Sequence, residues 1–203
     1  MKFFKIHNQQ KLNNMKKVIL TAVACVAVGI MSFNYIGSTY TVDTGSSEVK
    51  WTGYHLAKSY EHSGDIKLKS GNILVEDGKI TGGSFVIDMN SISNADITDE
   101  KKNAKLVGHL KSEDFFAVEK YAEAKLEIKS VEGSKAKAEI TIRGISNNIE
   151  FDFNVDEMTD NKIAASATIK IDRTVHEVMY GWTLENAMLS NEFKLDVKIV
   201  ANK

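Results

Sequence analysis

Residues 123–129 read Glu-Ala-Lys-Leu-Glu-Ile-Lys, an unbroken alternation of charged and apolar side chains. Successive side chains of a β-strand point to opposite faces of the sheet, so this order gives one charged face and one apolar face. A helical period would spread the charges around the whole circumference. The stretch therefore predicts a strand with one face in a core and the other in water.

The same alternation recurs from Tyr40 to the end of the chain, so the prediction extends to the whole domain. Apolar residues occupy every second position in four further stretches, residues 136–142, 149–155, 163–171 and 193–199. Shorter strand-like runs begin at Val49 and Phe85, and residues 63–75 predict one or two more strands. About eight antiparallel strands predict an all-β fold, an eight-stranded lipocalin-like barrel.

One short helix and several turns interrupt the strands. Acidic residues at its start and Gly108 at its end predict a helix over Asp99–Val107. The chain has no proline, so turns fall to glycine and asparagine, and residues 144–148 are predicted to join two hairpin strands. The long connection at residues 172–191 is either a plug at the barrel end or a lid over a ligand.

The first 38 residues are predicted to be a signal peptide or an anchor, and residues 39–203 the barrel domain. Lys16 and Lys17 precede the apolar run Val18–Phe33. An uncleaved membrane anchor is the alternative, because this run approaches the length of a spanning helix. Lipidation at Cys25 is a third reading. Membrane contact is expected only through an uncleaved or lipidated segment.

Composition and motifs argue against nucleic-acid, metal and cofactor chemistry. Without the five lysines that precede Asp43, 21 basic residues face 27 acidic ones, a net charge near −6. Cys25 is the only cysteine, and the histidines form no metal-binding pair. We therefore expect no metal, no cofactor, no catalytic residue and no nucleic-acid partner. An enzyme using His109 or His176 beside Asp172 is the weaker alternative.

Small residues on the predicted inner face leave room for a cavity. They are alanines at positions 124, 136, 138, 165 and 167. A tapering, filled barrel would use the same residues. Arg143, next to a glycine turn, is predicted either to recognise an anionic head group or to form an ion pair at the barrel rim.

Several segments, taken in order, resemble the YceI-like family of exported proteins. They are Tyr40-Thr41-Val42-Asp43 with Trp51, Ser84-Phe85-Val86-Ile87-Asp88-Met89, His109-Leu110-Lys111-Ser112-Glu113-Asp114-Phe115-Phe116, Ile140-Thr141-Ile142-Arg143-Gly144-Ile145 and Ile171-Asp172-Arg173. The segment ending in Phe116 is the most specific. The family often has a proline after this segment and another after the Arg-Gly turn, and this chain has neither.

The resemblance implies a lipocalin-like barrel that binds a polyisoprenoid or other long-chain lipid in the periplasm or another exported space. It also allows a homodimer. Phe115 and Phe116 are expected either to contact ligand or to fix the helix on the barrel. The alternative function is a filled barrel that acts as a protein-interaction or stress-response module. The ligand-binding residues carried over are Trp51, Phe85, Ile87, Leu126, Ile128, Ile142, Phe151, Phe153, Ile169 and Ile171.

Overall fold

The computed structural model describes residues 37–56, 60–179 and 188–203, and residues 36–203 form one compact unit. The predicted signal or anchor segment therefore lies almost wholly outside the described residues. So does much of the predicted connection at 172–191. Within the described ranges, no helix is long and apolar enough to cross a membrane.

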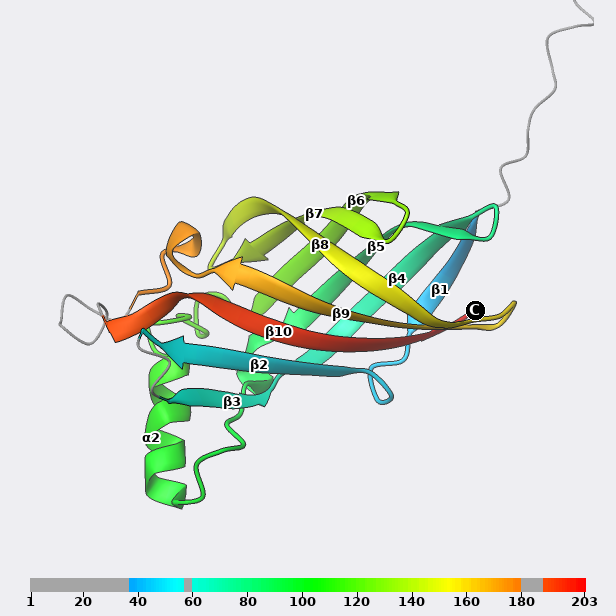
Figure 1. The fold of residues 1–203 in the computed structure, drawn as a ribbon. Coiled ribbons are helices and arrows are strands. Elements are labelled where there is room, and N and C mark those ends of the chain that lie inside the picture. Colours follow the sequence, from blue (N-terminus) through cyan, green and yellow to red (C-terminus); the bar gives the residue numbers. More distant parts are fainter. Residues whose placement is uncertain (1–36, 57–59, 180–187) are drawn as a thin grey trace, which may run out of the picture. The chain divides into compact units, whose positions relative to one another are not determined.

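In the described part of the chain, ten strands form one antiparallel sheet, with one α-helix and two short 3-10 helices beside it (Figure 1). The strands are β1 (Ser38–Val42), β2 (Glu48–His55), β3 (Glu61–Asp65), β4 (Lys67–Glu76), β5 (Lys79–Asp88), β6 (Glu123–Glu132), β7 (Lys135–Ile142), β8 (Ile145–Met158), β9 (Lys162–Asp172) and β10 (Leu189–Asn202). The helices are η1 (Met89–Ser91), α2 (Glu100–Lys111) and η2 (Thr174–His176).

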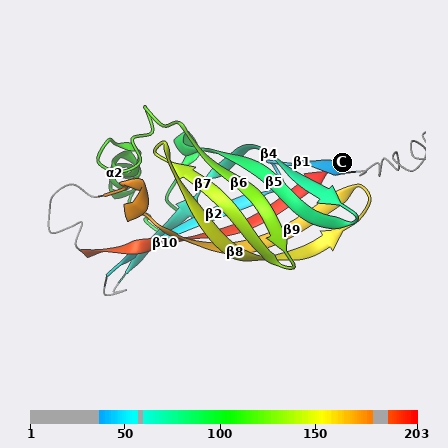
Figure 2. The same ribbon diagram turned by 90° about the horizontal axis from the view of Figure 1, so that it is seen from above.

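The sheet closes on itself because its first and last strands pair, with Thr41 opposite Asn202. β1 and β2 lie along successive parts of β10, and they pair with β4 and β3 respectively. The pair β1 and β2 therefore fills one strand position of the barrel, and the pair β3 and β4 fills the next one. The circuit therefore has eight places, which confirms the predicted eight-stranded antiparallel barrel. Figure 2 shows the strands winding obliquely around a common interior, with α2 at one end.

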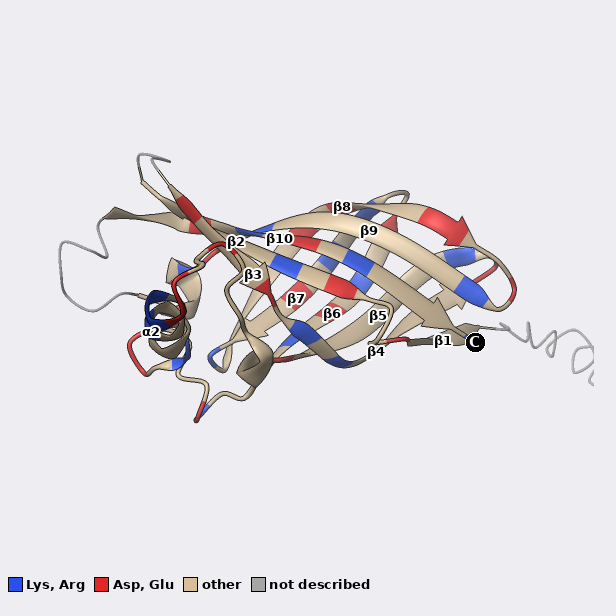
Figure 3. Cartoon of the chain, turned by 90° about the horizontal axis from the view of Figure 1, so that it is seen from below, with Lys and Arg blue, Asp and Glu red and all other residues tan. Residues whose placement is uncertain are grey.

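The alternation that predicted the strands sets which side chains enter the barrel. Leu126 of β6 lies opposite Ile140 of β7, which is buried in the core, and Leu126 packs against that core, while the neighbouring Lys125 is exposed. Acidic and basic residues are interspersed on the outer faces of the strands (Figure 3). Lys69 Nζ, for example, lies 2.7 Å from Glu123 Oε1. Such exposed pairs contribute little stability, so burial of the inner face holds the fold.

Two tight turns show where turn prediction succeeded and failed. Asp77 and Gly78 have positive φ values of 49° and 72°, as an Asp-Gly hairpin turn requires, and this turn uses glycine as expected of a chain without proline. The predicted connection at 144–148 is wrong, because Arg143 and Gly144 make the turn, at φ values of 52° and 74°, and β8 begins at Ile145. Asn147 and Asn148, which were expected to lie in the turn, are therefore part of β8.

The predicted helix is real but longer than expected. Asp99 caps its start, since its Oδ1 accepts a hydrogen bond from the Lys102 amide at 2.9 Å. The predicted end near Gly108 is wrong, because α2 continues to Lys111. Leu110, only 6% exposed, packs into the core one turn beyond the expected end. Burial of this side chain outweighs the small helix penalty of the glycine.

Candidate ligand-binding site

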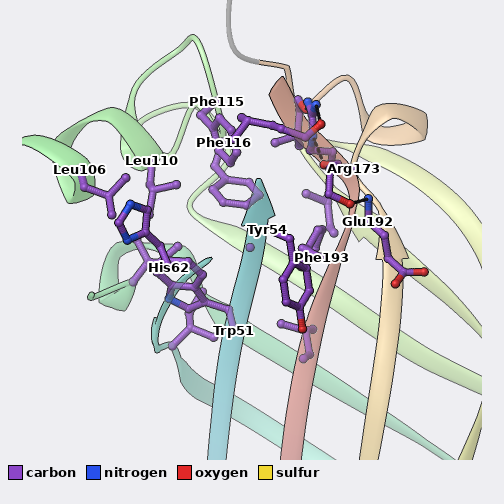
Figure 4. Close-up of a pocket in the computed structure, with 18 of the residues that line it drawn as sticks. Trp51, Tyr54, His62, Leu106, Leu110, Phe115, Phe116, Arg173, Glu192 and Phe193 are labelled. Atoms are coloured by element: carbon purple, nitrogen blue, oxygen red, sulfur yellow. Dashed lines mark hydrogen bonds between the residues drawn. The ribbon is translucent and has the colours of Figure 1, made fainter. Parts of the chain in front are cut away.

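Two apolar cavities lie within the described barrel. The upper cavity, about 260 Å³, lies beneath α2 (Figure 4), and the lower cavity, about 90 Å³, lies farther along the strands. Both are lined mainly by aliphatic and aromatic side chains from the inner faces of the strands. The prediction that the small inward residues leave a cavity holds for Ala124 in the upper cavity and for Ala165 and Ala167 in the lower. Ala136 and Ala138 are buried but line neither.

The roof of the upper cavity comes from α2 and the turn that follows it. Leu106 and Leu110 project from the helix, and Phe115 and Phe116 lie beside them (Figure 4). The Phe116 amide donates to the Leu110 carbonyl at 3.1 Å, which folds the chain back under the helix. The two phenyl rings meet edge to face, with centroids 4.9 Å apart. Both phenylalanines thus join the helix to the barrel and line the cavity.

Polar aromatic side chains gather at one edge of the upper cavity, where β2 ends and β3 begins. The rings of His55 and Tyr60 stack with centroids 4.8 Å apart, and His62 meets Tyr60 edge-on at 5.5 Å. His62 Nδ1 lies 2.7 Å from Asp96 Oδ2. Burial acts to raise the pKa of the Asp96 carboxyl, but hydrogen bonds from the Ser63 amide, His62 and Asn94 hold it below its ordinary value. This edge therefore offers a carboxylate-anchored row of rings.

Arg173 closes the opposite edge of the upper cavity through backbone contacts. It is 4% exposed, and its Nε and Nη1 donate to the carbonyls of Ser190 and Val178, each at 2.8 Å. Burial lowers the pKa of its guanidinium, although Asp172 acts in the opposite direction. These bonds tie η2 and the start of β10 to the end of β9. The arginine thereby shapes the wall of the cavity.

Arg143 bonds to backbone carbonyls, and its predicted recognition of an anionic head group stays a prediction. Its Nη1 donates to the carbonyls of Phe115 and Glu177, each at 2.7 Å. Among the described residues it forms no ion pair with a carboxylate, so the predicted rim salt bridge is absent. The side chain instead fastens the roof segment to the turn after η2.

The structure places nine of the ten predicted ligand-binding residues on a cavity wall. Their contact with a ligand stays a prediction. Trp51 and Ile142 line the upper cavity, and Ile87 lines both. Ile171 lines neither, because its side chain is enclosed by packed core neighbours and is only 1% exposed. The lower cavity holds the other six, Phe85, Leu126, Ile128, Phe151, Phe153 and Ile169.

Sequence reasoning missed much of the upper cavity. Phe193 and Leu195 of β10 lie on its wall, and the alternation of residues 193–199 already marked them as inward-facing. Met89 and Val178 also line it, from short segments without a strand or long-helix pattern. Only the folded arrangement of the barrel end brings these segments together.

The side chains of the alternative catalytic set do not meet in one pocket. His109 lines the upper cavity, and burial lowers its pKa against the opposing effect of Asp114. His176 is fully buried elsewhere, with Nδ1 3.0 Å from the Ile145 carbonyl oxygen, and Asp172 Oδ1 accepts a hydrogen bond from the Thr174 amide at 2.8 Å. Within the described part of the chain, no three His, Cys, Asp or Glu residues group as metal ligands would.

Comparison with known proteins agrees with this architecture. The YceI-like domain model matches residues 40–201. UPF0312 proteins of Staphylococcus aureus are 31% identical over 105 residues, which is 50% of this chain and 61% of theirs. Among solved structures, BcnA of Burkholderia cenocepacia has a TM-score of 0.63 at 18% identity, over 79% of this chain and 99% of its own. A polyisoprenoid binding domain from Saccharophagus degradans has a TM-score of 0.59 at 15% identity, over 80% and 97%. The family model spans nearly the whole described barrel, and the chain therefore belongs to the YceI-like family.

Proposed function

We propose that the barrel binds a long-chain amphiphile, of the polyisoprenoid or a related lipid class, and sequesters or carries it. The observation that carries this proposal is the upper cavity, whose wall is apolar except for polar groups near its edges. An apolar chain would fill the interior, and a head group would lie beside His55, Tyr60 and His62. The polyisoprenoid binding domain from Saccharophagus degradans has the same fold, which supports this ligand class.

Burial of the chain can supply the affinity. Each methylene moved from water into such a cavity contributes up to about 0.8 kcal/mol, so few polar contacts are needed. The competing function, a filled barrel that acts through its outer surface, predicts a packed interior. The two cavities argue against it.

The place of action proposed here is the periplasm or another exported compartment, with membrane anchoring as the alternative. Its support is the sequence of the first 38 residues, where two lysines precede a long apolar run. A homodimer is an arrangement that the family resemblance allows. Size-exclusion chromatography with light scattering would measure the assembly, and mass spectrometry of the protein isolated from its exporting cell would locate any cleavage.

The test of ligand binding is native mass spectrometry of the full chain, purified without detergent, followed by organic extraction. A bound long-chain lipid at one copy per protein is the expected result. The blocking variant is Ala124→Phe, because Ala124 is 4% exposed and lines the upper cavity, where a phenyl ring would occupy the ligand's space. We expect at least tenfold weaker binding of the extracted lipid.

The matched control is Ala164→Phe. Ala164 precedes Ala165, which lines the lower cavity, so its side chain lies on the outward face of β9. This variant receives the same ring and should bind the lipid as the wild type does. A wild-type protein that carries no lipid and rejects added isoprenoids would refute the proposed function, as would equal binding by wild type and a folded Ala124→Phe variant.

A further inference from the structure

Three side chains line both cavities, at the level where the two adjoin. Ile87 of β5, Ile140 of β7 and Leu195 of β10 line both of them, and all three belong to the hydrophobic core. In the closed order of strands, β5 and β7 flank β6, and β10 stands across the barrel from β6. The three side chains therefore approach one another from opposite walls.

The same level of the barrel has a small residue on the intervening strand. Ala124 of β6 pairs with Ile87 and lines only the upper cavity. The space beneath the roof thus widens at β6 and then narrows at the three larger side chains. Ile140 is 2% exposed, and its branched Cβ leaves it few alternative rotamers. A chain that entered from the upper cavity would meet these three side chains before it reached the lower one.

The cavity volumes set a scale for the ligand. An apolar protein cavity of roughly 150 Å³ accommodates benzene, with six carbon atoms. On that scale the upper cavity of about 260 Å³ holds roughly ten carbon atoms, the length of two isoprene units. The lower cavity of about 90 Å³ would add roughly four more if the two were joined.

We propose that Ile87, Ile140 and Leu195 form a partition that limits the length of apolar chain the barrel accepts. This inference rests on the proposed function and specifies its ligand as an amphiphile whose buried chain has about ten carbons. Up to that length, each added methylene should tighten binding by as much as about fourfold. Beyond it, added carbons stay outside the cavity and bring no further gain.

The experiment measures dissociation constants of the full chain for a series of prenols by isothermal titration calorimetry. The probes are isopentenol, geraniol, farnesol and geranylgeraniol, which increase by one isoprene unit at a time and keep the hydroxyl head group constant. For the wild type we expect affinity to rise from isopentenol to geraniol and then to level off. For Ile140→Ala, which removes three carbons from the partition, the plateau should move to farnesol, with at least a tenfold gain for that probe.

A matched control separates the partition from a general loosening of the core. Ile163 of β9 is 0% exposed and lines neither cavity, so Ile163→Ala makes the same deletion away from the site. It should lower stability and leave the length profile unchanged. Leu195→Ala shortens the partition side chain on the opposite wall, and it serves as the second variant if Ile140→Ala does not fold.

The outcomes distinguish the inference from the function beneath it. Wild-type affinity that keeps rising through geranylgeraniol would overturn the partition, as would partition variants with the wild-type profile, and both results would leave lipid binding intact. Failure of the wild type to bind any prenol would overturn the proposed function together with the partition. A shift of the plateau in the partition variants alone would support the partition.

Discussion

Replacing Gly64 by alanine should damage the corner of the barrel that supports the upper cavity. Gly64 lies on β3 opposite Trp51, and a Cβ at this position would stand 1.9 Å from the carbonyl oxygen of Ser93 and 2.8 Å from the Cα of Asn94. The obstructing atoms are backbone, so no side-chain rotation relieves the clash. The Ser93 segment would have to withdraw by more than 1 Å to reach 3.0 Å, below which Cβ contacts are essentially never found.

The withdrawal would break identifiable hydrogen bonds. Trp51 Nε1 donates to the Ser93 carbonyl at 2.9 Å, the Ser93 amide donates to Asp65 at 3.0 Å, and the Ala95 amide donates to Ser63 at 2.9 Å. At about 1 kcal/mol for each bond, we expect a loss of roughly 3 kcal/mol in the free energy of unfolding. With a urea m-value of about 2 kcal/mol/M, the unfolding midpoint should fall by roughly 1.5 M.

Urea unfolding followed by tryptophan fluorescence measures this change, and Gly108→Ala is the matched control. Gly108 lies inside α2, where an added Cβ meets nothing within 4 Å. Alanine there should raise the free energy of unfolding by about 0.5–1 kcal/mol, because it restricts the unfolded chain and favours the helix. If Gly64→Ala unfolds within 0.5 kcal/mol of the wild type, the close approach of β3 to the Ser93 segment is refuted.

Two more predictions concern pH and the cavity wall. Burial holds the pKa of His176 below its ordinary value, so the unfolded chain takes up this proton first and the free energy of unfolding should fall as the pH is lowered from 7 to 5. His176→Asn should flatten this slope in urea unfolding measured at several pH values. An unchanged slope would exclude His176 as its source. Arg173→Met removes the donors to Ser190 and Val178 and should cost about 3 kcal/mol in thermal unfolding, so a melting temperature equal to that of wild type would show those bonds to be dispensable.

Much of the barrel could be predicted because its strands and its helix start are each determined by a short, continuous stretch of sequence. Residues 123–129 reveal a two-faced strand without any tertiary contact, and Asp99 marks the start of α2 by a cap that involves only its own first turn. The end of α2 is different, since Leu110 extends the helix by packing against residues distant in sequence. The turn at Arg143 also escaped prediction, because a non-glycine residue seldom adopts a φ of 52°.

The candidate site was predictable only in part, for a related reason. Inward positions such as Phe153 and Leu126 follow from alternation, and the structure places them at the lower cavity. The upper cavity also needs Phe116, Val178 and Phe193, which come from three separate regions of the chain. No periodic pattern in the sequence indicates that these regions meet. The roof of the cavity could therefore be identified only from the folded structure.

The pairing of β1 with β10 also determines how the chain can be reconnected. Thr41 and Asn202 lie side by side at this seam, and their separation in sequence is close to the full length of the barrel. Contacts between such distant residues make closure a slow step in folding. A short linker from Lys203 to Ser38, with new ends opened at the Asp77–Gly78 turn, would give a circular permutant in which β1 follows β10 directly. That permutant turns the seam into a local hairpin and makes the pairing of β4 with β5 the new long-range contact, so closure of the barrel should remain a slow step in its folding.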